Sequence, residues 1–226
     1  MYKQQNYLTK LKNGQATPFL DPKEQIELKQ KLKNETYHIY KPYQDSEKNI
    51  LYVTNIPEVI LYEIKSKIPL RHQDILGTIH SLNIKNEVFG DIIIKDNHYY
   101  IYLLSQMKNY FESNLLTIKN SLVELIPLPL VTLENYERSY EEIKLITSSI
   151  RIDTVIANIM NTSRQKAVMK IKNKEVLLNY DILTNSSYLL KENDIFSIRK
   201  YGKFKYIGII KKTKKDNFII CCQKYI

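Results

Sequence analysis

Apolar residues recur at helical spacing in two stretches of the last third of the chain. The first stretch carries one stripe, Ile152, Val155, Ile156 and Ile159, which predicts a helix. Ser163 can cap a second helix, whose inward positions are Ala167, Val168 and Ile171 and whose outward positions are Gln165, Lys166, Met169 and Lys170. Short strands are predicted at 176–178, 195–199, 204–210 and 217–223. Two helices on a small sheet would leave one helix face and one hairpin loop, residues 211–216, strongly positive.

The first segment, to about Leu70, mixes helix and strand. Asp21 stands before Pro22, and Glu24 follows in the first turn, which is typical of a capped helix start. We expect a helix over residues 24–32 and a strand over residues 49–54.

A second unit begins near Pro69. Ile75, Ile79 and Leu82 share one helical face. Strands at 90–95 and 99–104 flank a turn, Ser105 can cap a helix that runs to about residue 119, and Pro127 ends a strand at 122–126. Residues 134–146 then read as a link. The predicted fold class is α+β, with an α/β region at 1–68, a compact α/β domain at 69–146 and a third domain at 147–226.

Composition places the chain among globular proteins. Its 226 residues are 43% hydrophobic and 26% charged, and no apolar stretch approaches the roughly 18 residues of a membrane span. The first residues lack an apolar signal region. We therefore expect a cytoplasmic protein with no membrane partner, and nothing in the sequence requires more than a monomer.

Cysteine and glycine usage argues against several kinds of site. The only cysteines, Cys221 and Cys222, are adjacent within a predicted strand, where they point to opposite faces as free thiols and match no zinc spacing. The five glycines form neither a P-loop nor a dinucleotide fingerprint. No metal or cofactor is predicted.

Charge is distributed very unevenly. Residues 148–226 hold 16 Lys and Arg against 6 Asp and Glu, a balance of +10, whereas residues 1–147 hold 18 of each. A basic surface confined to one end of a chain typically has a polyanionic partner. Nucleic acid is the leading candidate.

The spacing of polar residues in this basic region indicates which kind of nucleic-acid-binding domain it resembles. Arg151-x-Asp153, Ser163-Arg164-x-x-Ala167, Ile171-Lys172, Val176, Asn179 and Glu192-Asn-Asp194-Ile195 together resemble the S-four RNA-binding domain over residues 148–206. The RNA-binding residues expected in this region are Arg151, Ser163, Arg164, Lys166, Lys170, Lys172, Asn179, Arg199, Lys200, Lys203 and Lys205.

Each of these positions has a possible role in RNA binding and also a purely structural explanation. The N-terminal dipole of the second helix favours a phosphate, and Arg164 there can offer a fork of donors. Arg151 and Asp153 can instead cap the first helix. Tyr201 and Phe204 are either stacking platforms or core residues, and individual lysines of the 211–215 loop are explained by solvation alone.

The front of the chain points to a narrower family. Ala16-Thr-Pro-Phe-Leu-Asp-Pro, Arg71-His-Gln-Asp-Ile-Leu-Gly77 and Gly90-Asp-Ile-Ile-Ile are similar to the YlmH-type RNA-binding proteins of low-GC bacteria. This resemblance implies a middle domain like the RNA-recognition motif and work on ribosomal RNA of the large subunit at stalled complexes that carry peptidyl-tRNA. Arg71 and His72 are candidates for a second RNA contact, with helix capping and packing as the alternative. Lys200 and Lys203 depart from the family pattern, which has glycine and arginine there.

Two other functions compete with RNA binding. Pseudouridine synthases also carry an S-four domain, and Arg71-His-Gln-Asp74 superficially resembles their catalytic segment. Capping of the helix that follows explains Asp74 more simply, and no second acid–base group can be named. A basic module for acidic lipid or an acidic protein is the third class, but the helices lack an aromatic and basic interfacial face. The sequence thus favours a non-enzymatic RNA-binding protein, and the family resemblance implies that its partners are structured ribosomal RNA and tRNA.

Overall fold

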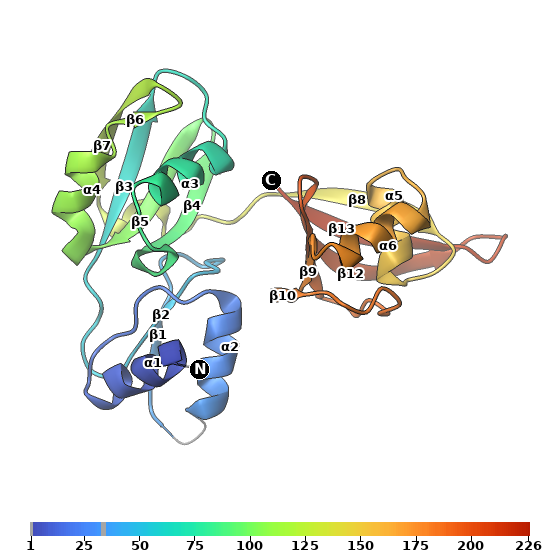
Figure 1. The fold of residues 1–226 in the computed structure, drawn as a ribbon, viewed down its shortest axis with the longest axis horizontal. Helices are drawn as coiled ribbons and strands as arrows, with labels where there is room; N and C mark the ends of the chain where they lie inside the picture. The colour runs from blue at the N-terminus through green and yellow to red at the C-terminus, as the bar shows by residue number, and fades with distance from the viewer. Residues whose placement is uncertain (1, 33–34) are drawn as a thin grey trace. The chain divides into compact units, whose positions relative to one another are not determined.

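The computed structural model describes residues 2–32 and 35–226. The chain forms two compact units, Met1–Glu137 and Arg138–Ile226, which are described separately. Both combine helices with strands, in agreement with the predicted α+β class (Figure 1). Within the described ranges, no helix is long and apolar enough to cross a membrane.

The first unit begins with two helices and a two-stranded ribbon. The elements are α1 (Tyr2–Lys12), α2 (Pro22–Lys31), β1 (His38–Tyr40) and β2 (Ile50–Tyr52), and the two strands pair antiparallel. Asp21 accepts a hydrogen bond from the Glu24 backbone N–H, while the Glu24 carboxylate accepts one from the Asp21 N–H, so the predicted helix start is confirmed. Leu11, Leu28 and Leu51 are buried between these elements.

A five-stranded antiparallel sheet follows, in the order β4-β5-β3-β7-β6. Its strands are β3 (Val59–Ser66), β4 (Phe89–Lys95), β5 (His98–Leu104), β6 (Thr117–Ile118) and β7 (Ser121–Leu128). The helices between them are α3 (His72–Ser81) and α4 (Lys108–Asn114), with short 3-10 turns η1 (Asn86–Val88), η2 (Ser105–Met107) and η3 (Leu130–Leu133). The chain order β3-α3-β4-β5-α4-β7 is a β-α-β-β-α-β arrangement.

Three expectations for this unit differ from the structure. The expected boundary at 68/69 separates β3, which ends at Ser66, from the sheet in which it is the central strand, so Pro69 does not begin a domain. Ser105 hydrogen-bonds Glu58 instead of capping a helix, and α4 ends at Asn114. Strand β7 runs through Pro127, which is tolerated there because β6 pairs only with the other end of β7.

Both faces of this sheet are covered. Tyr62 and Ile101 pack with Ile75 of α3 and Phe111 of α4 in one core. On the opposite face, Tyr102 belongs to a second core to which the N-terminal segment and η3 contribute buried side chains, among them Phe19, Tyr43 and Leu133. Much of the face opposite the helices is therefore occupied by the chain's own residues.

The second unit is a six-stranded antiparallel sheet in the order β10-β9-β11-β12-β13-β8. Its elements are β8 (Tyr140–Thr147), α5 (Ile152–Ile159), α6 (Arg164–Lys172), β9 (Val176–Leu178), β10 (Asp181–Ile182), β11 (Ile195–Ile198), β12 (Gly202–Lys212) and β13 (Phe218–Tyr225). Residues expected to be a link form β8, which pairs with β13 from Thr147 to Tyr140. The unit therefore starts at Arg138 rather than at residue 147.

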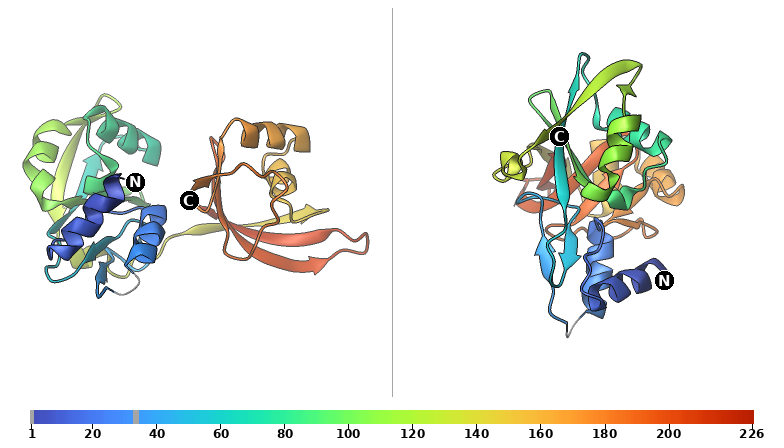
Figure 2. Two further views of the ribbon diagram at one scale, coloured as in Figure 1. Left: turned by 60° about the horizontal axis from the view of Figure 1, so that its bottom comes forward. Right: turned by 90° about the vertical axis from the view of Figure 1, so that its left-hand side faces the viewer.

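Helices α5 and α6 cover one face of this curved sheet (Figure 2). Ile152, Val155 and Ile156 of α5 meet Ala167 and Ile171 of α6 over the sheet, which confirms the predicted stripes. The sheet contributes Phe196, Phe204 and Ile220 among its fully buried side chains. Ile159 and Val168, also expected inside, are half-buried.

The adjacent cysteines lie on β13, where neighbouring side chains alternate between faces. Both are free and buried. Burial raises the pKa of the Cys222 thiol to about 12, so it is protonated and unreactive at neutral pH. Among the described residues, no group of His, Cys, Asp and Glu side chains has the arrangement of a metal site.

Candidate nucleic-acid interface

Helix α6 begins with a cap and two exposed cations. The Lys166 backbone N–H donates to Ser163 Oγ at 3.4 Å, which confirms the predicted cap. Arg164 and Lys166 lie in the first turn with exposed side chains. The helix N-terminus and these two cations favour an anion at the same place.

A buried carboxylate beside this helix start holds two arginines. The Asp153 side chain is 1% exposed. It accepts from Arg151 Nε at 3.2 Å and Nη2 at 3.0 Å, and from Arg164 Nε at 3.0 Å. Arg151 is the N-cap residue of α5 and Asp153 lies in its first turn, as the capping alternative expected, but no side-chain hydrogen bond caps this helix. We call Asp153, Arg151 and Arg164 the arginine clamp.

The clamp remains charged at neutral pH. Burial disfavours the carboxylate, but hydrogen bonds and charge from the two guanidinium groups outweigh it and hold the pKa of Asp153 below its usual range. Two cations and one anion leave the clamp with a net charge of one positive unit. The Arg164 side chain is 54% exposed and that of Arg151 is 32% exposed, so both present guanidinium surface to solvent in fixed positions.

Lys170 is less available than the sequence suggested. It forms an ion pair with Glu175, and its ammonium lies 5.7 Å from the centre of the exposed Tyr201 ring. The hydrogen bond from Lys170 holds the pKa of Glu175 below its usual range, with further contributions from Arg199 and Lys200. Glu175 thus gathers cations from the end of α6 and from the turn before β12 at one place, while neutralising part of their charge.

Two of the expected RNA-binding residues, Lys203 and Lys205, lie on the face of the sheet that is not covered by α5 and α6. Phe204 and Tyr206 of β12 are buried beneath the helices, and side chains alternate along a strand. Lys203 and Lys205 therefore project from the face away from α6. The Lys203 ammonium lies 4.7 Å from the ring centres of both Tyr180 and Tyr225. The expected set of cations is therefore divided between two faces.

Asn179 has a structural task. It lies in the left-handed backbone region with φ 49°, donates to Asp194 Oδ1 at 2.8 Å and accepts from the Ile195 N–H at 2.9 Å. These bonds fix the turn after β9 to the start of β11. Phe204 is a core residue, whereas Tyr201 is 42% exposed and stays a candidate for stacking.

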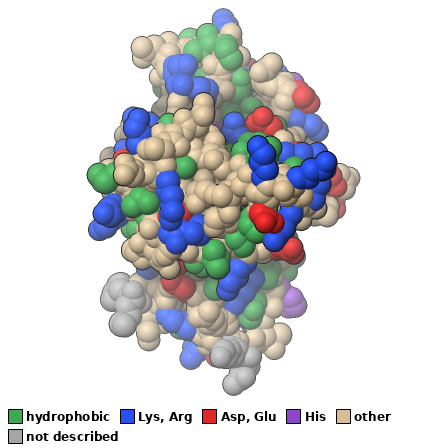
Figure 3. Space-filling model, turned by 90° about the vertical axis from the view of Figure 1, so that its right-hand side faces the viewer, with side chains coloured by type: hydrophobic (Ala, Val, Ile, Leu, Met, Phe, Trp, Pro, Cys, Tyr) green, Lys and Arg blue, Asp and Glu red, His purple; other side chains and the backbone are tan. Residues whose placement is uncertain are grey.

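The remaining basic residues are exposed, although Glu175 offsets part of the charge of Arg199 and Lys200. Lys166, Lys172, Arg199 and Lys200 are exposed, and within the described ranges no ion pair is formed by any of them. Lys and Arg side chains are prominent on the face drawn in Figure 3, with Asp and Glu side chains interspersed. The sequence did not reveal the clamp role of Asp153 or the screening by Glu175, because both depend on contacts made only in the fold.

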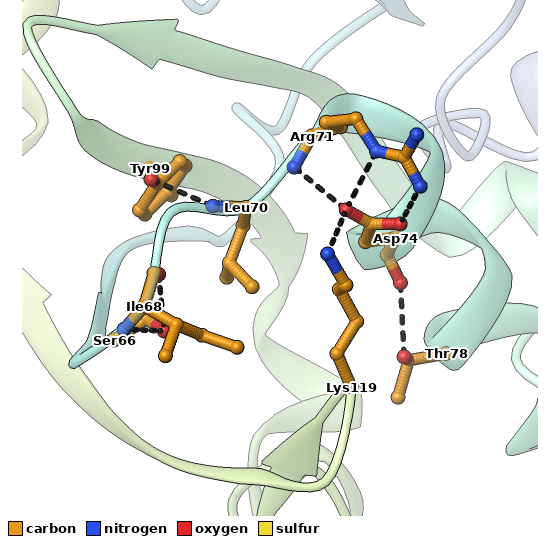
Figure 4. Close-up of polar contacts among 8 residues, drawn as sticks. All are labelled: Ser66, Ile68, Leu70, Arg71, Asp74, Thr78, Tyr99 and Lys119. Carbon is orange, nitrogen blue, oxygen red and sulfur yellow. Dashed lines mark hydrogen bonds and ion pairs between the residues drawn. The ribbon is translucent and has the colours of Figure 1, made fainter.

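The expected second contact, Arg71 and His72, lies at the start of α3 (Figure 4). The Asp74 carboxylate accepts hydrogen bonds from Arg71 Nε at 3.1 Å, from Arg71 Nη2 at 2.9 Å and from the Arg71 backbone N–H at 2.9 Å. Lys119 Nζ lies 3.5 Å from Asp74 Oδ2. These contacts hold the pKa of Asp74 well below its usual range. The Arg71 fork is thus engaged within the chain, and His72 is exposed beside it.

The other front motifs serve packing. The Asp91 carboxylate accepts from Tyr43 OH at 2.7 Å and from the Glu47 N–H at 2.8 Å. A Cβ on Gly90 would lie 3.1 Å from both Phe19 and Tyr102. Internal hydrogen bonds and close packing therefore explain why these front motifs occur together, and no ligand is needed to explain them.

Comparison with known proteins gives the chain its relatives. Residues 58–132 match the family model described as "Putative RNA-binding domain in YlmH". The chain is similar to YlmH-type proteins. The "Ribosome-associated protein quality control protein P2" of Bacillus subtilis (strain 168) is 28% identical over 153 residues, which are 68% of this chain and 60% of that protein.

A solved structure supports the fold. The "Cell division protein ylmH from Streptococcus pneumoniae" has a TM-score of 0.50 and 20% identity, over 59% of this chain and 91% of the solved one. At this identity the likeness concerns the fold alone. The family model and the Bacillus subtilis relative support the predicted resemblance to a YlmH-type RNA-binding protein. The S-four assignment of the C-terminal unit stays a prediction.

Proposed function

We propose that the chain is a non-catalytic RNA-binding protein that grips structured ribosomal RNA through its C-terminal unit. The observation that carries this proposal is the charge of residues 138–226, where 18 Lys and Arg against 8 Asp and Glu leave +10. Neutralisation of phosphates and release of their counterions then drive binding. The arginine clamp, the α6 N-terminus and Lys166 supply fixed donors on one face.

The ribosome is the proposed location of that RNA. The Bacillus subtilis relative is named as a ribosome-associated protein, and the matched residues span 60% of its length. We propose the same partner for this chain. We infer binding to the large subunit in the cytoplasm, with contact to tRNA as part of ribosome quality control. The S-four type of the C-terminal unit is part of the same proposal.

The rival enzyme function has weaker support. Its only candidate is Asp74, which lies in the first turn of α3, has an 8% exposed side chain and contacts Arg71 and Lys119. An acid–base or nucleophilic role would require freeing this carboxylate from two cations.

Two measurements test the proposal. The affinity of the full chain for purified ribosomal RNA should fall steeply with salt, by roughly 0.7–0.9 log units per log unit of salt for each phosphate contacted. In a cell lysate, the protein should sediment with large ribosomal subunits. A salt-independent affinity, or migration only with free proteins, would contradict the proposal, and isomerised uridine in RNA incubated with the protein would favour the enzyme.

A further inference from the structure

The end of the β12–β13 hairpin carries the densest charge in the chain. Lys211, Lys212, Lys214 and Lys215 fall within five residues, next to a single acidic residue, Asp216. We call residues 209–219 the hairpin finger. In the part of the chain that the structure describes, none of these four lysines forms an ion pair, in contrast to Arg151, Arg164 and Lys170. Their charge is therefore presented to solvent without screening by carboxylates.

The finger is ordered although it lacks a core. None of its side chains is buried, whereas Ile220, directly after it, is completely buried. Its turn is closed by hydrogen bonds from the Thr213 N–H to the Asn217 carbonyl at 2.8 Å and from the Asn217 N–H to Thr213 Oγ1 at 3.1 Å. Lys212 lies over the Phe218 ring at 5.2 Å. A preformed tip loses little conformational freedom when a partner binds it.

The finger extends beyond both helices of its unit (Figure 1). At roughly 3.3 Å per residue, the strand from Gly208 to the turn spans about 15 Å. This reach gives the finger access to a part of a large partner that the α6 face does not touch. Two separated contacts on one folded RNA would reinforce each other.

The arrangement of the lysines indicates what kind of partner fits. Lys211 and Lys212 are consecutive on β12, so they point to opposite faces of the hairpin, and Lys214 and Lys215 lie in the turn. Cations on both faces and at the tip suit a cleft bounded by phosphate backbones on two sides. A flat acidic protein surface would engage only one of the faces.

A lipid bilayer fits this finger less well. Its foremost residues, 213–217, are all polar, while the exposed Ile209 and Ile210 stand behind them. Insertion into a bilayer requires the apolar side chains to lead and the lysines to remain at the headgroups. The order here is the reverse.

We propose that the hairpin finger is a second RNA-binding site, which inserts between phosphate backbones of folded RNA independently of the α6 face. This inference rests on the proposed RNA-binding function and adds a site to it. RNA recognised by shape and phosphate contacts suits such a finger, because the lysines offer no base-specific geometry.

The test replaces all four lysines by glutamine in the full-length chain. None of them is buried, so the thermal unfolding midpoint should stay unchanged. The affinity for purified ribosomal RNA should fall at least about tenfold, and the slope of log affinity against log salt should decrease by about 2–4, close to one for each lost phosphate contact. Replacement of the same four by arginine should retain the affinity.

The matched control makes the same change of charge in the first unit. Lys65, Lys67, Lys85 and Lys95 are all exposed, and their fourfold replacement by glutamine should alter affinity less than about twofold. Equal losses in both variants would show an effect of net charge alone and would overturn the finger site. Undiminished binding by the finger variant would overturn it too while leaving the proposed function intact.

Two further outcomes separate the alternatives. If the unmodified chain fails to bind ribosomal RNA, the proposed function itself is wrong. If the unmodified chain binds vesicles of phosphatidylserine and phosphatidylcholine and the finger variant loses that binding but keeps RNA binding, the finger is a lipid site and the inference is overturned.

Discussion

The two units of this chain differ in the kind of evidence that connects them with RNA. Residues 58–132, which match the RNA-binding family model, carry 7 Lys and Arg against 8 Asp and Glu, a balance of −1. The C-terminal unit carries +10. Counterion release needs cations, so the matched region cannot supply the electrostatic part of the affinity. Resemblance to a family and the capacity to attract a polyanion are thus properties of different parts of the molecule.

The motifs of the two units also differ in what their residues do. Front motif residues such as Asp91 and Gly90 are held in packing and internal hydrogen bonds. In the C-terminal unit, Arg164 and Lys166 are exposed. A sequence motif therefore indicates a binding surface only where its side chains remain accessible.

The largest effect should come from the α6 face. Replacement of Arg164 and Lys166 together by glutamine should weaken binding to ribosomal RNA about tenfold to a hundredfold, at roughly 1 kcal/mol or more for each contact. Filter binding or fluorescence anisotropy measures this. The control, Lys65 and Lys67 replaced by glutamine in the neutral unit, removes the same charge and should change little. Equal effects would contradict the assignment of binding to α6.

The arginine clamp provides a test that separates net charge from the orientation of the arginines, because the two predict opposite changes in RNA affinity. Asp153→Asn adds one positive charge to the unit, so net charge alone predicts tighter RNA binding. Loss of the carboxylate that fixes Arg151 and Arg164 predicts binding several-fold weaker and a free energy of unfolding lower by about 1–3 kcal/mol. Glu192→Gln at an exposed position of the same unit raises the net charge by the same amount with the clamp intact and serves as the control. Tighter binding by Asp153→Asn would show that orientation of the arginines is unimportant.

Acid should lower the free energy of unfolding of the C-terminal unit by protonating the Asp153 carboxylate. The pKa of Asp153 is lowered in the fold, so the unfolded chain binds more protons as pH falls past the usual carboxyl value near 3.9. The stabilisation is complete above that value and is lost below it. Unfolding by denaturant between about pH 6 and 3 should therefore show a smaller pH dependence in Asp153→Asn than in the unmodified chain. Identical slopes would contradict the lowered pKa.

The smallest effect is expected at the front. Arg71→Ala should change RNA affinity less than about twofold, because its guanidinium fork is already engaged by Asp74 and one charge is a small part of the total. A loss comparable with that of the α6 variant would place an RNA contact at Arg71 and contradict its assignment to an internal ion pair.

Local patterns predicted those elements whose signal is local. The stripes of α5 and α6 and the caps at Asp21 and Ser163 depend on spacings within one turn or two. Strand β8 was missed because it is a half-exposed edge strand whose charged residues, such as Glu141 and Glu142, mask its alternation. The central place of β3 was also missed, since it depends on pairing with strands far along the chain.

Residue type alone places the candidate cations in the C-terminal unit, and their role in binding stays a prediction. Their division between two faces follows from the register of β12, which the sequence pattern did not reveal. The pairing of Lys170 with Glu175 and the clamping of Arg164 by Asp153 arise only when helix ends meet loops. Such tertiary contacts decide which cations remain available.

The most direct measurement compares the ribosomal RNA affinity of residues 138–226 alone with that of residues 1–137 alone, each verified as folded by circular dichroism. The account predicts that the C-terminal unit keeps the affinity of the full chain within about tenfold and that the first unit binds at least about a hundredfold more weakly. Binding by residues 1–137 at full strength, with none by residues 138–226, would contradict it.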